Sequence, residues 1–204
     1  MSTVHLTILY YSSTGTNYTM AQTAAAAASE LGAEVRVVRV AELAPQEVIA
    51  SNLAWKAHVE KATSVPIATL DDIGWADAVI ISTPTRFGNV ASQLKQFLDT
   101  TGSLWAQGKL TNKVVSAMTS ASNLHGGQEA TVLSLYTSMY HWGAIVVAPG
   151  YTDSSIAAAG GNPYGTSLTV DIDGKFDING LEAVKHQARR VVTVAGALKK
   201  GFNV

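Results

Sequence analysis

The sequence predicts an α/β fold in which helices cover both faces of a doubly wound parallel sheet. Short β-branched runs alternate with longer helical stretches along the chain, which is the pattern of βαβ units. The segments after the strand-like runs are rich in Ser, Thr, Asn and Gly, and loops at the carboxyl ends of parallel strands are where such sheets bind ligands. The chain has no internal repeat and no linker, so we expect one domain over residues 1–204.

Five strands and four long helices account for the pattern. The first strand is the apolar run LTILYY, and the alanine-rich segment that follows the next loop forms the first helix. In chain order, we expect strands at residues 4–10, 34–39, 78–82, 113–118 and 144–148, and helices at 16–31, 90–100, 128–141 and 178–199. Two connections are long: residues 41–75 are expected to hold some helix, and residues 149–167 are expected to form a loop rich in Gly, Ser and Ala.

The composition excludes several classes of function. The 14 Lys and Arg nearly balance the 15 Asp and Glu, without a clustered basic segment, so we expect no direct contact with nucleic acid. The chain has no cysteine, which rules out disulfides and thiolate metal sites, and we predict no metal centre. The N-terminus lacks the pattern of a signal peptide and the alanine run at 24–28 is too short to span a bilayer, so we expect no membrane association and a cytoplasmic location.

A hydroxyl-rich loop follows the first predicted strand and opens the first predicted helix. It contains Ser12, Ser13, Thr14, Gly15, Thr16 and Asn17. Hydroxyl donors, a glycine that permits a tight turn and the unpaired N–H groups of a helix N-terminus together favour a phosphate site. The motifs of nucleotide hydrolysis and dinucleotide binding are absent, and no Lys or Arg lies between Tyr11 and Gln22, so a terminal monophosphate held by neutral donors fits best. The alternative is a simple turn and helix cap.

Two more polar loops follow the third and fourth predicted strands. The first consists of Pro84, Thr85, Arg86, Phe87, Gly88 and Asn89, whose N–H groups and aromatic ring suit the edge and face of a planar ligand. The second contains Ser120, Ala121, Ser122, Asn123, Leu124, His125 and Gly126, and its small polar residues suit a ring system or a polyol chain. An ordinary surface turn is the alternative for each loop.

Three further residues are candidates for chemistry. Trp105 and Tyr164 lie in predicted loops, where they can stack on a planar substrate, although singly each is more typical of packing. His141 ends a predicted helix, where a capping role and a chemical role are both open.

In combination, these segments resemble the WrbA family of flavodoxin-like NAD(P)H:quinone oxidoreductases, historically called tryptophan-repressor-binding proteins. The resemblance rests on the hydroxyl-rich loop, PTRFGN at 84–89, TGSLWAQG at 101–108, GGQE at 126–129 and PYG at 163–165, and it covers nearly the whole chain. It implies a flavodoxin-like five-stranded sheet in the order 2-1-3-4-5, bound FMN, a homotetramer, and two-electron reduction of quinones by NADH or NADPH. It further implies ping-pong turnover through one flavin site and a role in protection from oxidative stress.

The resemblance also gives each candidate residue a role. Residues 12–17 would hold the FMN phosphate, Thr85, Arg86 and Phe87 would lie along the isoalloxazine, and residues 120–126 would contact the ring edge and the ribityl chain. Arg86 would stabilise the negative charge of the reduced ring. Trp105 would line the substrate pocket, for which Tyr164 is a further candidate because of its residue type. His141 would reach FMN from a neighbouring subunit and hydrogen-bond the substrate or pass a proton. Thr14 stands where the family often has an aromatic residue near the nicotinamide.

Two other functions are open alternatives. A flavodoxin-type carrier of single electrons gains from strong surface charge that guides docking, and a net charge of −1 argues against it. An accessory protein that binds a transcriptional repressor is the other alternative, and its support is the historical name of the family.

Overall fold

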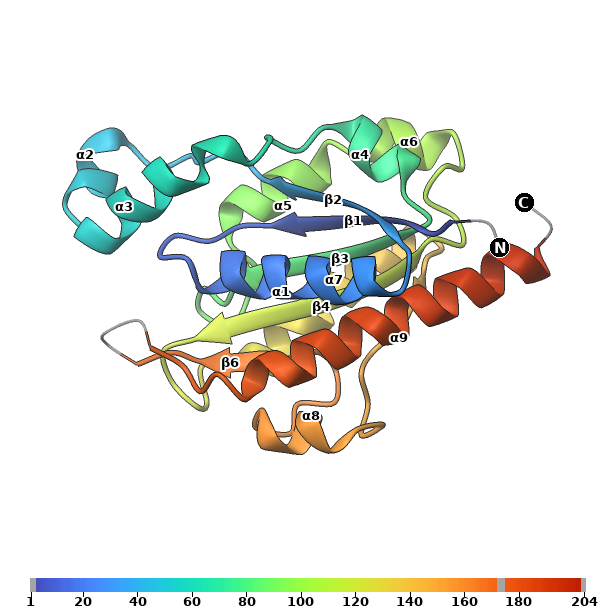
Figure 1. Cartoon of the computed structure of the whole chain (residues 1–204). Coiled ribbons are helices and arrows are strands. Elements are labelled where there is room, and N and C mark those ends of the chain that lie inside the picture. The colour runs from blue at the N-terminus through green and yellow to red at the C-terminus, as the bar shows by residue number, and fades with distance from the viewer. Residues whose placement is uncertain (1–2, 172–174, 203–204) are drawn as a thin grey trace.

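A parallel β-sheet forms the centre of the computed structural model, which describes residues 3–171 and 175–202 (Figure 1). Its strands are β1 (His5–Tyr10), β2 (Glu34–Arg39), β3 (Ala78–Pro84), β4 (Val114–Ala121), β5 (Ile145–Val146) and β6 (Ser167–Thr169). The order is β2-β1-β3-β4-β5, and these strands pair in parallel throughout. The predicted doubly wound sheet and its order are therefore confirmed, and β6 is a sixth strand beyond the five that were predicted.

Two short strands share the edge of the sheet next to β4. β5 pairs with the start of β4 and β6 pairs with its end, where Thr119 lies opposite Ser167. The prediction of a loop at residues 149–167 is wrong in part, because this stretch contains the helix α8 (Ser154–Ala158) and leads into β6. β6 has 3 residues, which is too short to show the alternation by which a sequence predicts a strand.

Helices cover both faces of the sheet. They are α1 (Thr16–Glu30), α2 (Gln46–Ala50), α3 (Leu53–Lys61), the 3₁₀ turn η1 (Ala62–Ser64), α4 (Leu70–Trp75), α5 (Ser92–Asp99), α6 (Gly102–Ala106), α7 (Gln128–His141) and α9 (Gly180–Gly201). α1 and α9 pack on one face, and α4, α5, α6 and α7 pack on the other (Figure 1). Among the residues that the structure describes, no helix is long and apolar enough to cross a bilayer.

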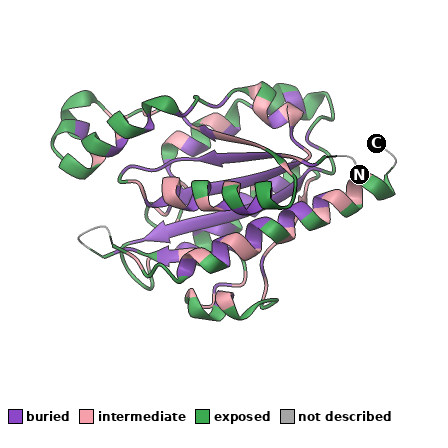
Figure 2. Cartoon of the chain, in the orientation of Figure 1, coloured by how far each residue is buried: buried purple, intermediate pink, exposed green. Residues whose placement is uncertain are grey.

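Each face of the sheet has its own apolar core. β1, β3 and β4, which lie between the two cores, are almost fully buried, whereas the arm formed by α2 and α3 (residues 46–61) is mostly exposed (Figure 2). Buried strands without hydrophobic–polar alternation are the expected result of helices on both faces.

The bounds of most elements agree with the prediction. α7 spans residues 128–141 as predicted, and residues 41–75 hold α2, α3 and α4. The main difference is that β3 and β4 run past their predicted ends to Pro84 and Ala121, and both extensions are buried and paired, with Pro84 opposite Ser120. Pro84, Ser120 and Ala121 therefore belong to strands and not to the loops in which the sequence placed them.

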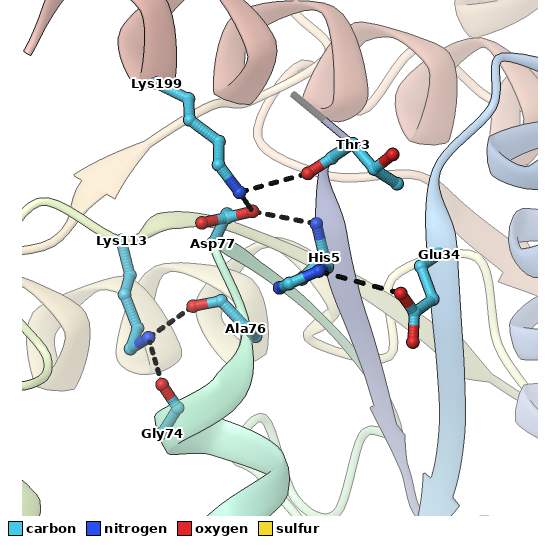
Figure 3. Close-up of polar contacts among 8 residues, drawn as sticks. All are labelled: Thr3, His5, Glu34, Gly74, Ala76, Asp77, Lys113 and Lys199. Carbon is cyan, nitrogen blue, oxygen red and sulfur yellow. Dashed lines mark hydrogen bonds and ion pairs between the residues drawn. The ribbon is translucent and has the colours of Figure 1, made fainter. Parts of the chain in front are cut away.

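Buried caps and an ion pair close the amino end of the sheet (Figure 3). The ammonium group of Lys113, which is buried just before β4, donates to two carbonyl oxygens at the end of α4. The Asp77 carboxylate accepts a hydrogen bond of 2.6 Å from Lys199 Nζ on α9 and one of 2.8 Å from the N–H of His5 on β1. This end is thus held together by the chain's own groups. A cavity of about 680 Å³ also lies here, lined by Asp77, Lys113 and Lys199, and these side chains are engaged in the contacts just described. The loops at the carboxyl end lie where sheets of this kind bind their ligands.

Candidate functional site

A pocket of about 680 Å³ lies at the carboxyl ends of β1, β3 and β4. In a sheet of this order, the winding direction reverses between β1 and β3, and the loops diverge there to leave room for a ligand. The volume is typical of small-molecule sites. The lining residues are Ser12, Ser13, Thr14, Thr16, Asn17, Asn52, Ala54, Pro84, Thr85, Arg86, Ser120, Ala121, Ser122, Asn123, Val170 and Asp171.

The first loop (residues 12–17) presents backbone N–H groups at one end of the pocket. Gly15 is the N-cap residue of α1, with φ 103°, and no side chain caps this helix. The N–H of Gly15 donates to Ser12 Oγ at 2.9 Å, which fixes the turn. α1 is 15 residues long, so its first N–H groups and its dipole favour an anion at this position.

The Asn17 side chain ties the first turn of α1 to the sheet. It is 1% exposed. Its Nδ2 donates to Ser82 Oγ at 3.1 Å, and its Oδ1 accepts a hydrogen bond of 2.7 Å from Ser120 Oγ. Ser82 belongs to β3 and Ser120 to β4, so one amide group fixes the first loop against two strands. Since this amide is engaged within the chain, we expect Asn17 to contact a cofactor through its backbone N–H.

A tight turn at residues 86–89 borders the pocket. Arg86 and Asn89 exchange backbone hydrogen bonds of 2.8 and 3.0 Å, which places Phe87 and Gly88 at the tip with φ of 52° and 75°. Positive φ at both tip positions is the geometry of a type I′ turn. This conformation costs a residue such as Phe87 about 1–3 kcal/mol. The Phe87 side chain is fully exposed, so burial within this chain does not offset the cost.

Close contacts hold this turn against the neighbouring loops. Arg86 Nη2 donates to Ser13 Oγ of the first loop at 3.0 Å, and the N–H of Thr85 donates to a carbonyl oxygen of β4 at 2.8 Å. Gly127, the N-cap residue of α7 with φ 89°, lies so near the turn that an added Cβ would be 2.6 Å from Gly88 Cα. Glycine is required for this approach. The loops after β1, β3 and β4 therefore form one continuous wall.

The structure brings most of the predicted cofactor residues to the pocket, but not all. Gly15, Phe87, Gly88, Asn89, Leu124, His125 and Gly126 are outside its lining. Gly15 shapes the turn of the first loop, and the residues at 87–89 form the turn beside the pocket. Leu124 and His125 face a neighbouring cavity of about 320 Å³, and Gly126 packs against Ala121.

Trp105 and His141 lie together, at the end of the sheet opposite the pocket. Trp105 Nε1 donates to the carbonyl oxygen of His141 at 3.0 Å. α6, which carries Trp105, lies away from the strand arrowheads in Figure 1, and His141 ends α7 shortly before β5 begins. Tyr164 is also outside the lining, and its carbonyl oxygen accepts a hydrogen bond of 2.7 Å from Tyr136. None of these predicted residues reaches the pocket of its own chain.

Sequence reasoning missed the residues that close the pocket from two sides. Asn52 and Ala54 come from the start of α3, and Val170 and Asp171 follow β6. Asn52 is the N-cap residue of α3, with its Oδ1 accepting from the N–H of Trp55 at 3.0 Å, and an Asn before a helical stretch is a signal that could have found it. Residues 170–171 carry no comparable signal, because β6 is too short.

Glu42 holds the arm beside the pocket. Its carboxylate accepts hydrogen bonds from Trp55 Nε1 at 3.0 Å, Tyr11 OH at 3.0 Å and Gln93 Nε2 at 2.8 Å. Burial raises the pKa of Glu42, but these bonds and the one from the N–H of Ala44 outweigh burial, so the pKa lies below its ordinary value. Burial, followed by the Glu42 charge, raises the pKa of Tyr11, which stays a hydrogen-bond donor at neutral pH.

The pocket suits a phosphate monoester that is joined to a flat ring system through a polar chain. The uncapped N-terminus of α1 suits the phosphate, the hydroxyl groups of Ser12 and Thr16 suit its oxygens, and the wall at residues 84–86 and 120–123 suits the chain and the ring edge. FMN has these three parts, so the donor set fits it. The described residues hold no group of His, Asp and Glu that could bind a metal ion.

Comparisons with known proteins identify the family. Residues 6–158 match the family described as NADPH-dependent FMN reductase. An NAD(P)H dehydrogenase (quinone) from Deinococcus radiodurans is 51% identical over 195 residues, which is 96% of this chain and 97% of the relative. One from Paracoccus denitrificans is 43% identical over 202 residues, which is 95% of each chain. The chain belongs to the FMN reductase family.

Solved structures agree with this family at the level of the fold. A WrbA-like flavodoxin from Agrobacterium tumefaciens has a TM-score of 0.67 at 20% identity, over 96% of this chain and 99% of that one. A flavodoxin from the domain Archaea has a TM-score of 0.62 at 15% identity, over 94% of this chain and 99% of that one. The predicted family and the flavodoxin-like fold are confirmed.

We predict that Gly127→Ala weakens FMN binding about tenfold or more, which is about 1.4 kcal/mol. The added Cβ would displace Gly88 and with it the turn at residues 86–89. Gly32→Ala is the matched control, because Gly32 has a similar φ of 79° and nothing within 4 Å of an added Cβ. Fluorescence titration of FMN with both variants measures the effect, and equal affinities would contradict the role given to the contact between Gly127 and Gly88.

Proposed function

We propose that this protein binds FMN in the pocket at the carboxyl ends of β1, β3 and β4 and catalyses the two-electron reduction of quinones by NADH or NADPH. The observation that carries the proposal is that one pocket contains both the uncapped N-terminus of α1 and the turn at residues 86–89. The Asn17 amide fixes the start of α1 against the sheet, and the hydrogen bond between Arg86 and Ser13 joins the turn to the first loop. The family match and the relatives named NAD(P)H dehydrogenase (quinone) support the same activity.

The first loop binds the phosphate end of the cofactor. The hydroxyl groups of Ser12, Thr14 and Thr16 line the pocket, and together with the N–H groups that open α1 they donate to phosphate oxygens. The backbone at residues 84–86 and 120–123, which lines the rest of the pocket, would hold the ring system. When bound, FMN supplies a ring system that accepts two electrons from the nicotinamide and passes them to the quinone.

Arg86 places a positive charge beside the ring position. Its Nη2 donates to Ser13 Oγ at 3.0 Å and its Nη1 to the carbonyl oxygen of Thr85 at 3.2 Å, so the guanidinium is oriented before any ligand enters. We propose that this guanidinium stabilises the negative charge that develops in the pocket when the cofactor is reduced. His141 of a neighbouring subunit is assigned to donate a proton to the quinone oxygen. Because one pocket serves both substrates, turnover is ping-pong.

A homotetramer, arranged as a dimer of dimers, completes the site in this proposal. Trp105 and His141 are absent from the pocket of their own chain, and Phe87 is fully exposed beside that pocket in a strained turn. A second copy that brings its Trp105 and His141 to the pocket would cover Phe87 and supply both missing residues. Symmetric assembly gives every pocket the same neighbour.

We also propose a cytoplasmic location and a role in protection from oxidative stress. Two-electron reduction of a quinone releases no one-electron product, which makes a protective role reasonable. The location is supported by the N-terminal sequence, which lacks the pattern of a signal peptide, and the protective role by the family resemblance.

The activity is tested with purified, FMN-loaded protein. We expect benzoquinone to oxidise NADH or NADPH, with parallel double-reciprocal plots, as ping-pong kinetics requires. Arg86→Gln is expected to lower kcat about tenfold or more, because the positive charge beside the ring is lost. Arg189→Gln, at an exposed position on α9, is the matched control and should leave kcat unchanged. Loaded protein without quinone-dependent turnover would contradict the proposal.

The shared site predicts complementation between two impaired subunits. Trp105→Ala and Arg86→Ala chains, each expected to have strongly lowered activity on its own, are co-expressed with different tags and purified as mixed oligomers. Random pairing restores about a quarter of the sites, because an intact Arg86 then meets an intact Trp105 from its neighbour. Activity that equals the mean of the two variants would show that each chain builds its site alone.

A further inference from the structure

His58 lies against the first loop from the side of the arm. It belongs to α3 and is 7% exposed. A Cβ built on Gly15 would be 3.5 Å from His58 Nδ1, and the imidazole centroid is 5.6 Å from that of Tyr18 on α1. A small cavity of about 30 Å³ separates His58 from Ser12. The imidazole is therefore directly behind the N-terminus of α1, where the phosphate of FMN is proposed to bind.

The surroundings of His58 are rich in positive charge. Lys61, on the same helix, places its Nζ 5.4 Å from the Tyr18 ring, and Arg39 at the end of β2 borders the cavity beside His58. The titratable groups that face the same space from other elements are Tyr10, Tyr11, Tyr18 and Glu42. Glu42, the acid among them, is engaged by hydrogen bonds from Tyr11, Trp55 and Gln93.

The free protein favours a neutral His58. Burial lowers the pKa of the imidazole, and the charges of Lys61 and Arg39 lower it further. A proton on the imidazole is thus unfavourable as long as these cations are not offset by an anion.

We infer that His58, with Lys61 and Arg39, forms an electrostatic backing for the first loop and takes up a proton from solvent when a phosphate monoester binds there. The neutral donors of the loop contact the phosphate, and the three side chains behind it supply charge at a distance. The first loop then distinguishes a phosphate ester from an unphosphorylated analogue by charge as well as by hydrogen bonds. This inference rests on the proposed FMN site and adds a residue that the sequence did not indicate.

The sign of the pH dependence follows from the direction of the change. Phosphate raises the pKa of His58 from its lowered value in the free protein, because a nearby anion favours the charged imidazole. The contribution of His58 to FMN affinity is therefore fully present below the free-state pKa and is lost as the pH rises through the pKa of the complex. The second ionisation of the phosphate itself, near pH 6, acts in the opposite direction. A variant that lacks the imidazole is needed to separate the two.

The direct test is an NMR titration of the imidazole signals in the free protein, with FMN and with riboflavin. The chain has 5 His, and the signal that disappears in His58→Gln, or that shows contacts to the Tyr18 ring if that variant does not fold, belongs to His58. We expect FMN to raise the midpoint of this titration by about one pH unit and riboflavin to leave it unchanged. Equal midpoints with the two ligands would overturn the inference and leave the proposed function intact, since FMN binding is visible in the same spectra.

Affinity gives a second readout. Between pH 8 and pH 6, the FMN affinity of the wild type should gain severalfold relative to that of His58→Gln, approaching the limit of about tenfold that a one-unit shift allows only at lower pH, and the riboflavin affinities should not diverge. His186→Gln, at α9 and far from the first loop in the chain, is the matched control and should follow the wild type. Lys61→Met should move the gain in FMN affinity to higher pH, because removal of a nearby positive charge raises the pKa of His58. Parallel pH profiles for the wild type and His58→Gln would contradict the inference.

Discussion

The buried amide of Asn17 is the contact on which the arrangement of the site depends. One side chain bonds Ser82 at 3.1 Å and Ser120 at 2.7 Å and so fixes the start of α1 against both central strands. A buried amide that lost these partners would cost about 1–3 kcal/mol for each unpaired group, so the first loop has one strongly preferred position. The turn at residues 86–89 then meets this loop through Arg86 and Ser13, and Gly127 permits the third loop to close against the turn.

The two ends of the sheet use charge differently. At the amino end, charged groups such as Lys199 and Asp77 are paired with each other within the chain. At the carboxyl end, the first loop offers neutral donors, and the cationic groups Lys61 and Arg39 stand behind it on α3 and β2. This arrangement keeps unpaired charge out of the buried part of the free protein, where it would be costly, and would still attract the phosphate that we propose to bind here. The arm thus contributes to the site in two ways: Asn52 and Ala54 line the pocket, and Lys61 adds positive charge near the first loop.

Local signals in the sequence were enough to predict the centre of the fold and the place of the first loop at a pocket. β1 to β4 are apolar runs of sufficient length, and the first loop combines hydroxyl groups and a glycine at a strand-to-helix junction. β6, α6 and α8 were missed because short elements carry little periodicity, so Trp105 lies in a helix and not in the loop that the sequence predicted. His58 was missed because its importance comes from proximity to Gly15, which only the folded chain creates. The separation of Trp105 and His141 from the pocket has the same origin, because topology and not local sequence places them at the opposite end of the sheet.

The central claim is that Asn17 fixes the phosphate-binding loop relative to the ring-binding wall, so that FMN engages both at once. The most direct measurement is the ratio of the riboflavin and FMN dissociation constants in the wild type and in Asn17→Ala. Riboflavin lacks the phosphate and depends on the wall alone. We expect the ratio to fall about tenfold or more in Asn17→Ala, because a loop that is no longer held in place loses the advantage of simultaneous binding. A ratio equal to that of the wild type would contradict the account.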